Sequence, residues 1–409
     1  MLGFAVVPLV VTLMSGAGVP PRQEPKRDPD PLVTDVPPWL ERARARLDAL
    51  EDKGFRPSVG TVISGSGFAM GAEVTQERFG RSLIGAGVEG QISVRDYREA
   101  AVRIGYLIHR RASVELRAAD APLYEPLTVE RHGSGFAAYV EHRYRASPSS
   151  SLYGTDTSGV LTRTDFSVSG TTTDLVFQHQ IGATLGVGAR VGVLAFDMSP
   201  GDDETRPDAH DVFAVHLHEA GLDRARYLTV GFGSVLDTRN RLGPPASGLY
   251  LTGAVWRFLS RTDEMPSFVR YTFDARHYQS IVSARHVIVT RLLGSYDAGR
   301  ADDIPPFYLL TSLGGGHSMR GFPTYRLRGG RLVGTSLEYR WHAWKFVELA
   351  PFVDAGRVWR APLPGTPDDW LVTPGFAVRF RTDRRVLVRA EIARSIEGVR
   401  YMIGIGSPF

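Results

Sequence analysis

The chain has 409 residues, of which 43% are hydrophobic and 22% are charged, and it contains 44 Gly, 26 Pro and no Cys. These proportions exclude a disordered tail, and the missing cysteines exclude a disulfide scaffold, a zinc–thiolate site and a cysteine nucleophile. The formal net charge is +4, and no block of Lys and Arg is interleaved with aromatic residues. The sequence therefore predicts no nucleic-acid partner.

The first residues are typical of an exported protein. Residues 2–14 are almost wholly apolar, and the small residues Ser15, Gly16 and Ala17 follow them. This order predicts a secretory signal peptide over residues 1–17. The apolar run is too short to cross roughly 30 Å of hydrocarbon as a helix, and no later apolar run is long enough either.

Two short segments follow the signal peptide. Residues 18–38 are rich in proline and charged residues, which predicts an exposed, semi-rigid spacer. Residues 39–54 place Leu40, Leu47 and Leu50 on one helical face, which predicts a single amphipathic helix. This helix could plug or cap a larger structure, or it could simply cover exposed apolar surface.

From about residue 55 onward, apolar and polar residues alternate. Leu337 and Tyr339, for example, alternate with Glu338 and Arg340. An apolar face and a polar face on strands of about ten residues are typical of a transmembrane barrel rather than a soluble sandwich. The predicted fold is all-β, an antiparallel outer-membrane β-barrel of about sixteen strands over residues 55–409.

The last nine strands of this barrel have the clearest pattern. In the final one Tyr401, Ile403, Ile405 and the terminal Phe409 share one parity, which predicts an apolar outer face up to the last residue. Between residues 108 and 187 the pattern is ambiguous, so the count there is open by two strands. The nine strands are predicted to begin near Tyr227, Ser247, Ser267, Ala284, Arg331, Phe346, Leu371, Arg385 and Val399.

One connection is long enough to indicate a functional loop. It spans residues 297–330, and the two strands after it carry Glu338 and Asp354 on their polar faces. If that face lines a lumen, an inward fold of the loop would bring Arg320 to either carboxylate and so compensate its buried charge. The loop motif consists of Gly314, Gly315, Met319, Arg320, Gly321 and Phe322.

Four segments together resemble one known family. They are Gly-Gly-x-x-x-Met-Arg-Gly-Phe at 314–322, Ser-Leu-Glu-Tyr-Arg at 336–340, Phe-Val-Asp-Ala-Gly at 352–356 and the C-terminal Phe. They resemble the bacterial surface antigen superfamily of outer-membrane β-barrels, the BamA/TamA-like proteins. The resemblance implies sixteen strands, a loop arginine at Arg320 that pairs with Glu338 and Asp354, and a strand signal at the C-terminus.

The resemblance also implies a function and its partners. Members insert proteins into the bacterial outer membrane or translocate them across it, so outer-membrane lipid and an unfolded or secreted client protein are the implied partners. No cofactor and no metal are implied, and the oligomeric state stays open. Members usually carry polypeptide-transport-associated domains before the barrel, and residues 18–56 are too short to form one. The predicted helix is the one candidate substitute.

Three functions compete at this point. An insertase or translocase would open a seam between residues near 57–65 and 399–409, so that a free edge templates an incoming strand. A passive pore would need a lumen that the long loop and the helix leave open. An enzyme would need a convergent acid, base or nucleophile cluster, and the sequence shows none.

Two motifs resemble catalytic or metal sites only superficially. The segment 316–320 nearly spells a nucleophile elbow, but Arg320 stands where the last glycine belongs. His210, His216 and His218 have a spacing that occurs readily by chance, so the sequence favours no metal there. The protein is therefore not expected to be an enzyme.

Overall fold

The computed structural model describes residues 54–60, 67–76, 84–106, 115–117, 135–156, 158–182, 184–218, 224–240, 244–262, 265–299, 305–381 and 386–409. The predicted signal peptide, the spacer and nearly all of the predicted amphipathic helix lie outside these residues. Within the described residues, no helix is both long enough and apolar enough to span a bilayer.

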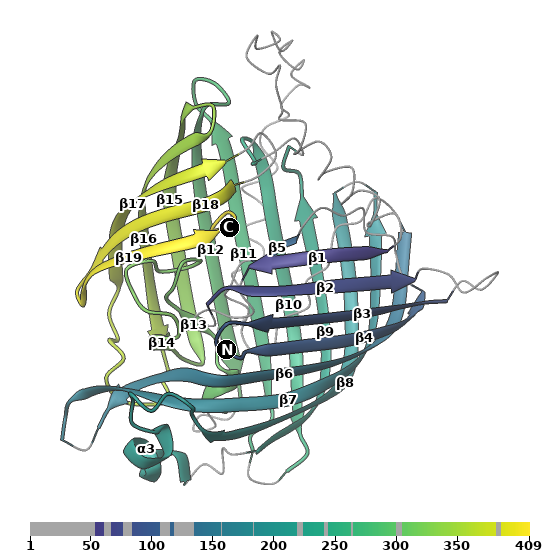
Figure 1. The fold of residues 1–409 in the computed structure, drawn as a ribbon, viewed down its shortest axis with the longest axis vertical. Coiled ribbons are helices and arrows are strands. Elements are labelled where there is room, and N and C mark those ends of the chain that lie inside the picture. The colour runs from purple at the N-terminus through teal and green to yellow at the C-terminus, as the bar shows by residue number, and fades with distance from the viewer. Residues whose placement is uncertain are drawn as a thin grey trace, which may run out of the picture. The chain divides into compact units, whose positions relative to one another are not determined.

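Sixteen strands, each antiparallel to the next, form one continuous ladder. The fold class is therefore confirmed as an antiparallel transmembrane β-barrel. Figure 1 shows the strands as β1 (Phe55–Gly60), β2 (Ala69–Gln76), β3 (Gly85–Ser93), β4 (Arg98–Tyr106), β6 (Gly135–Thr155), β7 (Leu161–Ile181), β8 (Leu185–Pro200), β9 (Arg224–Asp237), β10 (Gly248–Ser260), β11 (Phe268–Ser280), β12 (His286–Ala298), β15 (Arg331–Trp344), β16 (Val347–Trp359), β17 (Leu371–Arg381), β18 (Val386–Ser395) and β19 (Gly398–Ile405).

Five shorter elements accompany the ladder. The three-residue strand β5 (Glu115–Arg117) pairs in parallel with β1. The strands β13 (Ser312–Leu313) and β14 (Leu327–Arg328) form a separate hairpin. The helix α3 (Ala209–His218) and the 3-10 turn η1 (Phe307–Leu309) complete the described elements.

The last nine strands begin within three residues of their predicted starts. In the ambiguous region the chain forms two strands of 21 residues each, β6 and β7. Their register shifts between Ser147 and Ser150, because Pro148 lacks the N–H that a regular ladder needs. Around His210 the chain forms the helix α3, which is kinked at Phe213.

The alternation of β15 shows which face meets the lipid. Ser336, Glu338 and Arg340 are buried, whereas Leu337 is 54% exposed and Trp341 is 41% exposed. This is the inverse of a soluble protein, because lipid rather than water surrounds the wall of an outer-membrane barrel. The polar residues therefore line the lumen.

Two of the three longest connections lie at one end of the barrel, and the third, residues 107–134 between β4 and β6, lies at the other end. At that other end, residues 345–346 join β15 to β16 and residues 182–184 join β7 to β8. At the first end, residues 201–223 join β8 to β9 and residues 299–330 join β12 to β15. Outer-membrane barrels carry short periplasmic turns and longer extracellular loops. We call the first end the loop end and assign it to the outside.

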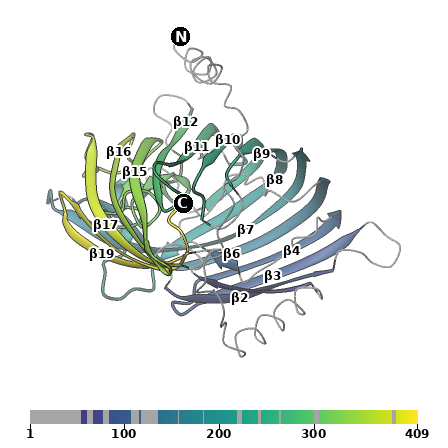
Figure 2. The same cartoon turned by 90° about the horizontal axis from the view of Figure 1, so that it is seen from above.

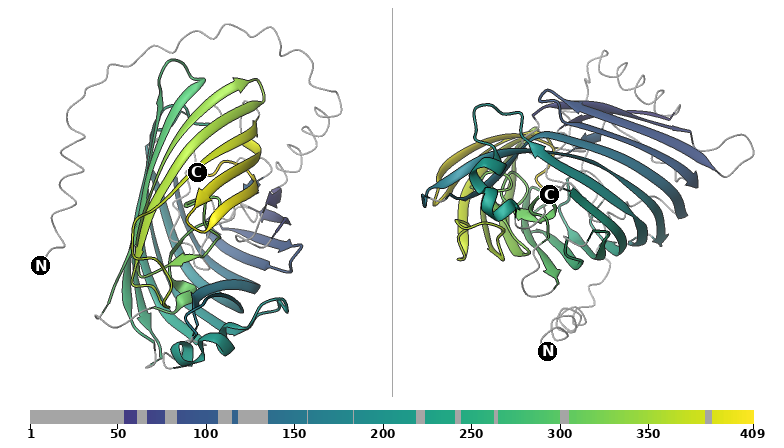
Figure 3. Two further views of the ribbon diagram at one scale, coloured as in Figure 1. Left: turned by 90° about the vertical axis from the view of Figure 1, so that its left-hand side faces the viewer. Right: turned by 90° about the horizontal axis from the view of Figure 1, so that it is seen from below.

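An apolar cluster lies inside the barrel at the loop end. Figure 3 shows α3 beside the long strands β6 to β8, and Phe213 of this helix is fully buried. The ring of Phe166 meets that of Phe307 in an edge contact at 4.9 Å between centroids. This loop-end cluster includes Leu152, Phe166, Phe196, Met198, Phe213, Tyr227, Trp256, Phe258, Phe268, Phe307, Tyr308, Leu309 and Leu310.

The first and last strands form the seam of the barrel. Within the described residues, β19 has a register with β18 and no register joins it to β1. Figure 2 shows the wall from above, running from β2 through β8 and β12 to β19. Tyr401 and Ile403 of β19 are 78% and 85% exposed, among the most exposed apolar side chains of the barrel.

The end of the chain departs from the predicted strand. β19 ends at Ile405, and Gly406 adopts a left-handed conformation with φ +75°. Phe409 then lies beside the guanidinium groups of Arg291 and Arg340, at 5.2 and 5.5 Å from its ring. The prediction that Phe409 extends the outer face is therefore wrong. The turn at Gly406 directs the ring into the lumen, where cations can lie against its aromatic face.

The inverted alternation predicts how the barrel responds to a charge on its outer face. Leu337→Arg, near the middle of β15, should lower the free energy of unfolding in lipid by about 2–4 kcal/mol. Val282→Arg places the same charge at a turn residue that is 86% exposed, and it should leave stability unchanged. Urea titration in vesicles measures both variants, and equal effects would contradict the assignment of the lipid-facing side.

Candidate functional site

The loop between β12 and β15 is folded into the lumen and bonded to the wall. Arg270 of β11 forms an ion pair with Asp297 at 2.6 Å and donates to the Leu309 carbonyl at 2.8 Å. Arg328 donates to the Phe307 carbonyl at 2.7 Å. Both guanidinium groups are buried. They satisfy backbone carbonyls that would otherwise lose hydrogen bonds to water.

The glycines of the loop motif form a tight turn. Gly314 has φ +124°, and a Cβ there would lie 2.1 Å from the Pro323 carbonyl oxygen. The N–H of Gly315 donates to the Phe322 carbonyl at 2.9 Å, which closes the turn. At Gly321 a Cβ would lie 2.6 Å from the Thr373 side chain. A side chain at Gly314 or Gly321 would therefore push the loop away from its own backbone or from β17.

The apolar residues of the motif hold the turn against the wall. Met319 and Phe322 are fully buried. Burial of two large side chains contributes several kcal/mol, on the order of 2–3 for each. They share one cluster with Leu313, Leu327, Leu332, Val358 and Leu371.

Arg320 lies at the centre of the site, where the structure brings it together with Glu338 and Asp354. Its Nε and Nη2 donate to the two oxygens of Asp354 at 2.8 and 2.7 Å, and its Nη1 donates to Glu338 at 2.7 Å. Its backbone N–H also donates to Asp354, at 3.1 Å. The guanidinium is 1% exposed. It stacks on Phe352 at 3.2 Å from the ring centroid.

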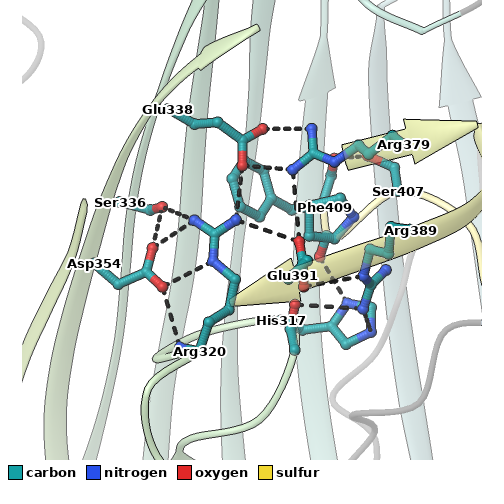
Figure 4. A network of polar contacts seen from close by, with 12 residues as sticks. His317, Arg320, Ser336, Glu338, Asp354, Arg379, Arg389, Glu391, Ser407 and Phe409 are labelled. Carbon is teal, nitrogen blue, oxygen red and sulfur yellow. Dashed lines mark hydrogen bonds and ion pairs between the residues drawn. The ribbon is translucent and has the colours of Figure 1, made fainter. Parts of the chain in front are cut away.

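Further charged residues extend this site across four strands (Figure 4). Arg379 of β17 donates to both oxygens of Glu338, at 2.7 and 2.6 Å, and to Glu348 at 2.8 Å. Arg340 donates to Glu338 at 2.6 Å. We call the set the lumen ion network. Its charges balance, because four guanidinium groups face four carboxylates: Arg320, Arg340, Arg379 and Arg389 with Glu338, Glu348, Asp354 and Glu391.

Sequence reasoning missed Arg379 as a partner of Glu338. The residue lies between Val378 and Phe380, so its parity marks it as facing the lumen. Only the register shows which acid it meets, because Arg379 pairs across the ladder with Glu348. A one-residue slip would turn its side chain to the lipid.

His317 joins the loop to the end of the chain. Its Nδ1 lies 2.6 Å from the Pro408 carbonyl oxygen, so it donates there, and its Nε2 accepts from Arg389 at 3.1 Å. These bonds require a neutral ring. Burial, together with the neighbouring Arg389 cation, holds the pKa of His317 well below its usual range.

A second ion cluster lies on the opposite wall, on strands β2, β3, β4 and β6. Arg103 of β4 donates to Glu141 at 2.6 Å and to Glu73 and Glu89 at 3.0 Å each. Arg145 donates to Glu99 at 3.0 Å. Both walls of the lumen are therefore lined by paired charges.

The remaining predicted site residues lie elsewhere. Tyr401 and Ile403 are on the outer face of β19, and Ile405 is half-buried at its end. The side chains of His216 and His218 are outside the described residues. In the part of the chain that the structure describes, no group of three His, Asp or Glu side chains is arranged to hold a metal.

Arg320→Ala should lower the free energy of unfolding by about 3–5 kcal/mol, because it leaves the buried carboxylate of Asp354 without its counter-charge. Adding Asp354→Asn should recover part of that loss, since Glu338 keeps Arg340 and Arg379. Arg98→Ala breaks an exposed pair with Asp96 and serves as the control without effect. Unchanged heat-modifiable migration and unchanged loop proteolysis in both Arg320→Ala and Asp354→Asn would refute the pairing.

The bonds of His317 predict a loss of stability in acid. Above about pH 6.5 the ring is neutral in both states, whereas below it the unfolded chain binds a proton that the folded ring resists. Stability should fall as the pH drops from about 7 to 5, by at most about 1.4 kcal/mol per unit from this group. His317→Gln should flatten this part of the profile, and substitution of the exposed His179 should not. A profile that His317→Gln leaves unaltered would contradict the neutral assignment.

Comparisons with known proteins agree with this architecture. The family model described as the Omp85 superfamily domain matches residues 117–381, more than half of the chain. BamA from Haemophilus ducreyi lacking POTRA domains 1–3 is 18% identical with a TM-score of 0.59, and the match covers 86% of this chain and 69% of that one. For CdiB from Escherichia coli the values are 12%, 0.52, 86% and 62%. No curated protein matches the sequence.

These two structural matches support the barrel fold, and the family model identifies the family. The match of the model includes the loop motif and the strands that carry Glu338 and Asp354. The chain belongs to the Omp85 superfamily and is a bacterial outer-membrane protein.

Proposed function

We propose that the protein inserts client proteins into the outer membrane or translocates them across it. The observation that carries this proposal is the seam: β19 has a register with β18 alone, and none joins it to β1 within the described ranges. A strand edge without a regular neighbour can pair with an incoming strand by β-augmentation. The client would be an unfolded or secreted polypeptide, and surrounding outer-membrane lipid would be the second partner.

The distribution of ion pairs supports opening at the seam rather than between β15 and β18. Strands β15 to β18 are joined by backbone registers and also by the lumen ion network. Separating them would unpair buried charges, which costs several kcal/mol for each broken pair. Separating β19 from β1 breaks no such pair among the described residues. The mechanism needs no cofactor and no catalytic group.

The same structure disfavours a passive pore. The loop-end cluster places apolar side chains inside the barrel, and the inward loop is fixed to the wall by Arg270, Arg320 and Arg328. A diffusion channel needs a continuous polar path. We therefore assign no second function.

A disulfide across the seam tests the mechanism. The chain contains no cysteine, so one cysteine placed in β1 and one in β19 form a single possible bridge. Locking should abolish assembly or secretion of the client, and reduction should restore it. A bridge between the opposed residues Ala275 and Leu292 of β11 and β12 is the control. Full function in the seam-locked protein would remove the mechanism.

Depletion of the protein in its native host distinguishes the client classes. A joint fall of several unrelated barrel proteins in the outer-membrane proteome is expected for an insertase. Loss of one secreted or surface protein is expected for a dedicated translocator. No change in either class would contradict the proposed function.

A further inference from the structure

A cavity of about 940 Å³ lies beside β19 at the loop end of the barrel. Three other elements form its walls. Tyr153 comes from the end of β6, Arg163 from the start of β7 and His317 from the segment of the loop motif. On the side of β19, both Arg400 and the outward-facing Ile403 contribute to the lining. The cavity therefore reaches the seam and touches the lipid-facing surface.

Three hydrogen-bond donors, Arg163, Arg400 and Tyr153, converge in this cavity. Arg163 donates twice to the Ser151 hydroxyl, at 3.0 and 2.9 Å, and lies 5.5 Å from the ring centre of Tyr153. Tyr153 is 9% exposed, and its hydroxyl lies close to Ser151, which accepts from Arg163. The Nε of Arg400 is buried and has no acceptor among the residues that the structure describes. The positive charges of Arg163 and Arg400 both act on the Tyr153 hydroxyl.

Among the described residues, three acids near the cavity form their ion pairs with other arginines. Asp96 pairs with Arg98 at 2.6 Å, and Asp203 pairs with Arg206 at 3.0 Å. Glu397, which acts on Arg400, forms its ion pair with Arg326 at 2.7 Å.

One more acid, Asp202, lies in the lining. This single carboxylate faces two positive charges, those of Arg163 and Arg400, and these two charges repel one another. An anion between these two guanidinium groups would relieve the repulsion and accept hydrogen bonds from their N–H groups.

We propose that this cavity binds the phosphate of an outer-leaflet lipid. Phosphate oxygens match the donors of Arg163, Arg400 and Tyr153, because guanidinium groups bind phosphate through paired N–H bonds. The exposed Tyr401 and Ile403 line the same cavity, so a lipid can place its acyl chains along β19 while its phosphate enters the recess. A free phosphate ion would leave that apolar wall unused. This site goes beyond the proposed function, and neither depends on the other.

Native mass spectrometry of the full chain in detergent tests the proposal. The protein is titrated with short-chain phosphatidic acid, with the matching diacylglycerol and with inorganic phosphate. Arg163→Gln combined with Arg400→Gln should weaken binding of phosphatidic acid roughly 10- to 100-fold, and Tyr153→Phe should weaken it a few-fold. The matched control is Arg224→Gln with Arg285→Gln, which removes two exposed charges outside the cavity.

The arms separate the alternatives. The control and the diacylglycerol arm should show that the effect is specific to the cavity and to phosphate. Equal binding of phosphatidic acid and diacylglycerol would overturn the proposal, as would equal loss in the control. Binding of inorganic phosphate as tight as that of the lipid would overturn the assignment to a lipid. Tyr153→Phe keeps both charges, so it tests the site even if the double variant fails to fold.

Discussion

The structure depends on how the charge of Arg320 is compensated inside the barrel. A guanidinium at 1% exposure is tolerated only where carboxylates neutralise it and accept its hydrogen bonds. Asp354 binds it in a bidentate pair, and Glu338 is shared with Arg340 and Arg379. One loop residue is thereby tied to strands β15, β16 and β17. The position of the loop and the rigidity of this wall are consequences of the same charge balance.

This wall and the seam have opposite properties. Along β15 to β18 each strand is held by its neighbours and by buried ion pairs. Within the described residues, β19 has no register with β1 and presents exposed apolar side chains beside this edge. The last residues of the chain, after β19, contact the loop. His317 bonds to the Pro408 carbonyl, and the Arg320 guanidinium lies near the Phe409 ring. A barrel built in this way can part at one place while the rest of its wall stays intact.

The sequence predicted the barrel well because the signal is local. A period of two marks each strand, and lumen-facing polar residues at Glu338 and Asp354 follow from parity alone. The loop motif with Arg320 was visible for the same reason, since its glycines and apolar residues form one continuous segment. The approach of Arg320 to both carboxylates required only that the loop fold inward.

Contacts that depend on register were not predictable. Arg379 meets Glu338 and Glu348 only because β17 pairs with β16 in one particular register. The cluster around Arg103 was hidden, because its partner Glu141 lies in β6, where Pro148 and the serines around it obscure the alternation. Phe409 was wrongly predicted to lie on the outer face. The alternation in the sequence continues to Phe409, but the left-handed turn at Gly406 ends it in the structure.

Hydrogen exchange of the full chain in lipid bilayers tests the central claim most directly. If the lumen ion network holds the loop, the amides of Gly315 and Phe322 should exchange as slowly as those of the β15–β16 ladder, because both donate within a buried turn. In Arg320→Ala these amides should lose protection while the ladder from β6 to β8 keeps its own. Fast exchange of the loop in the unaltered protein would contradict the account.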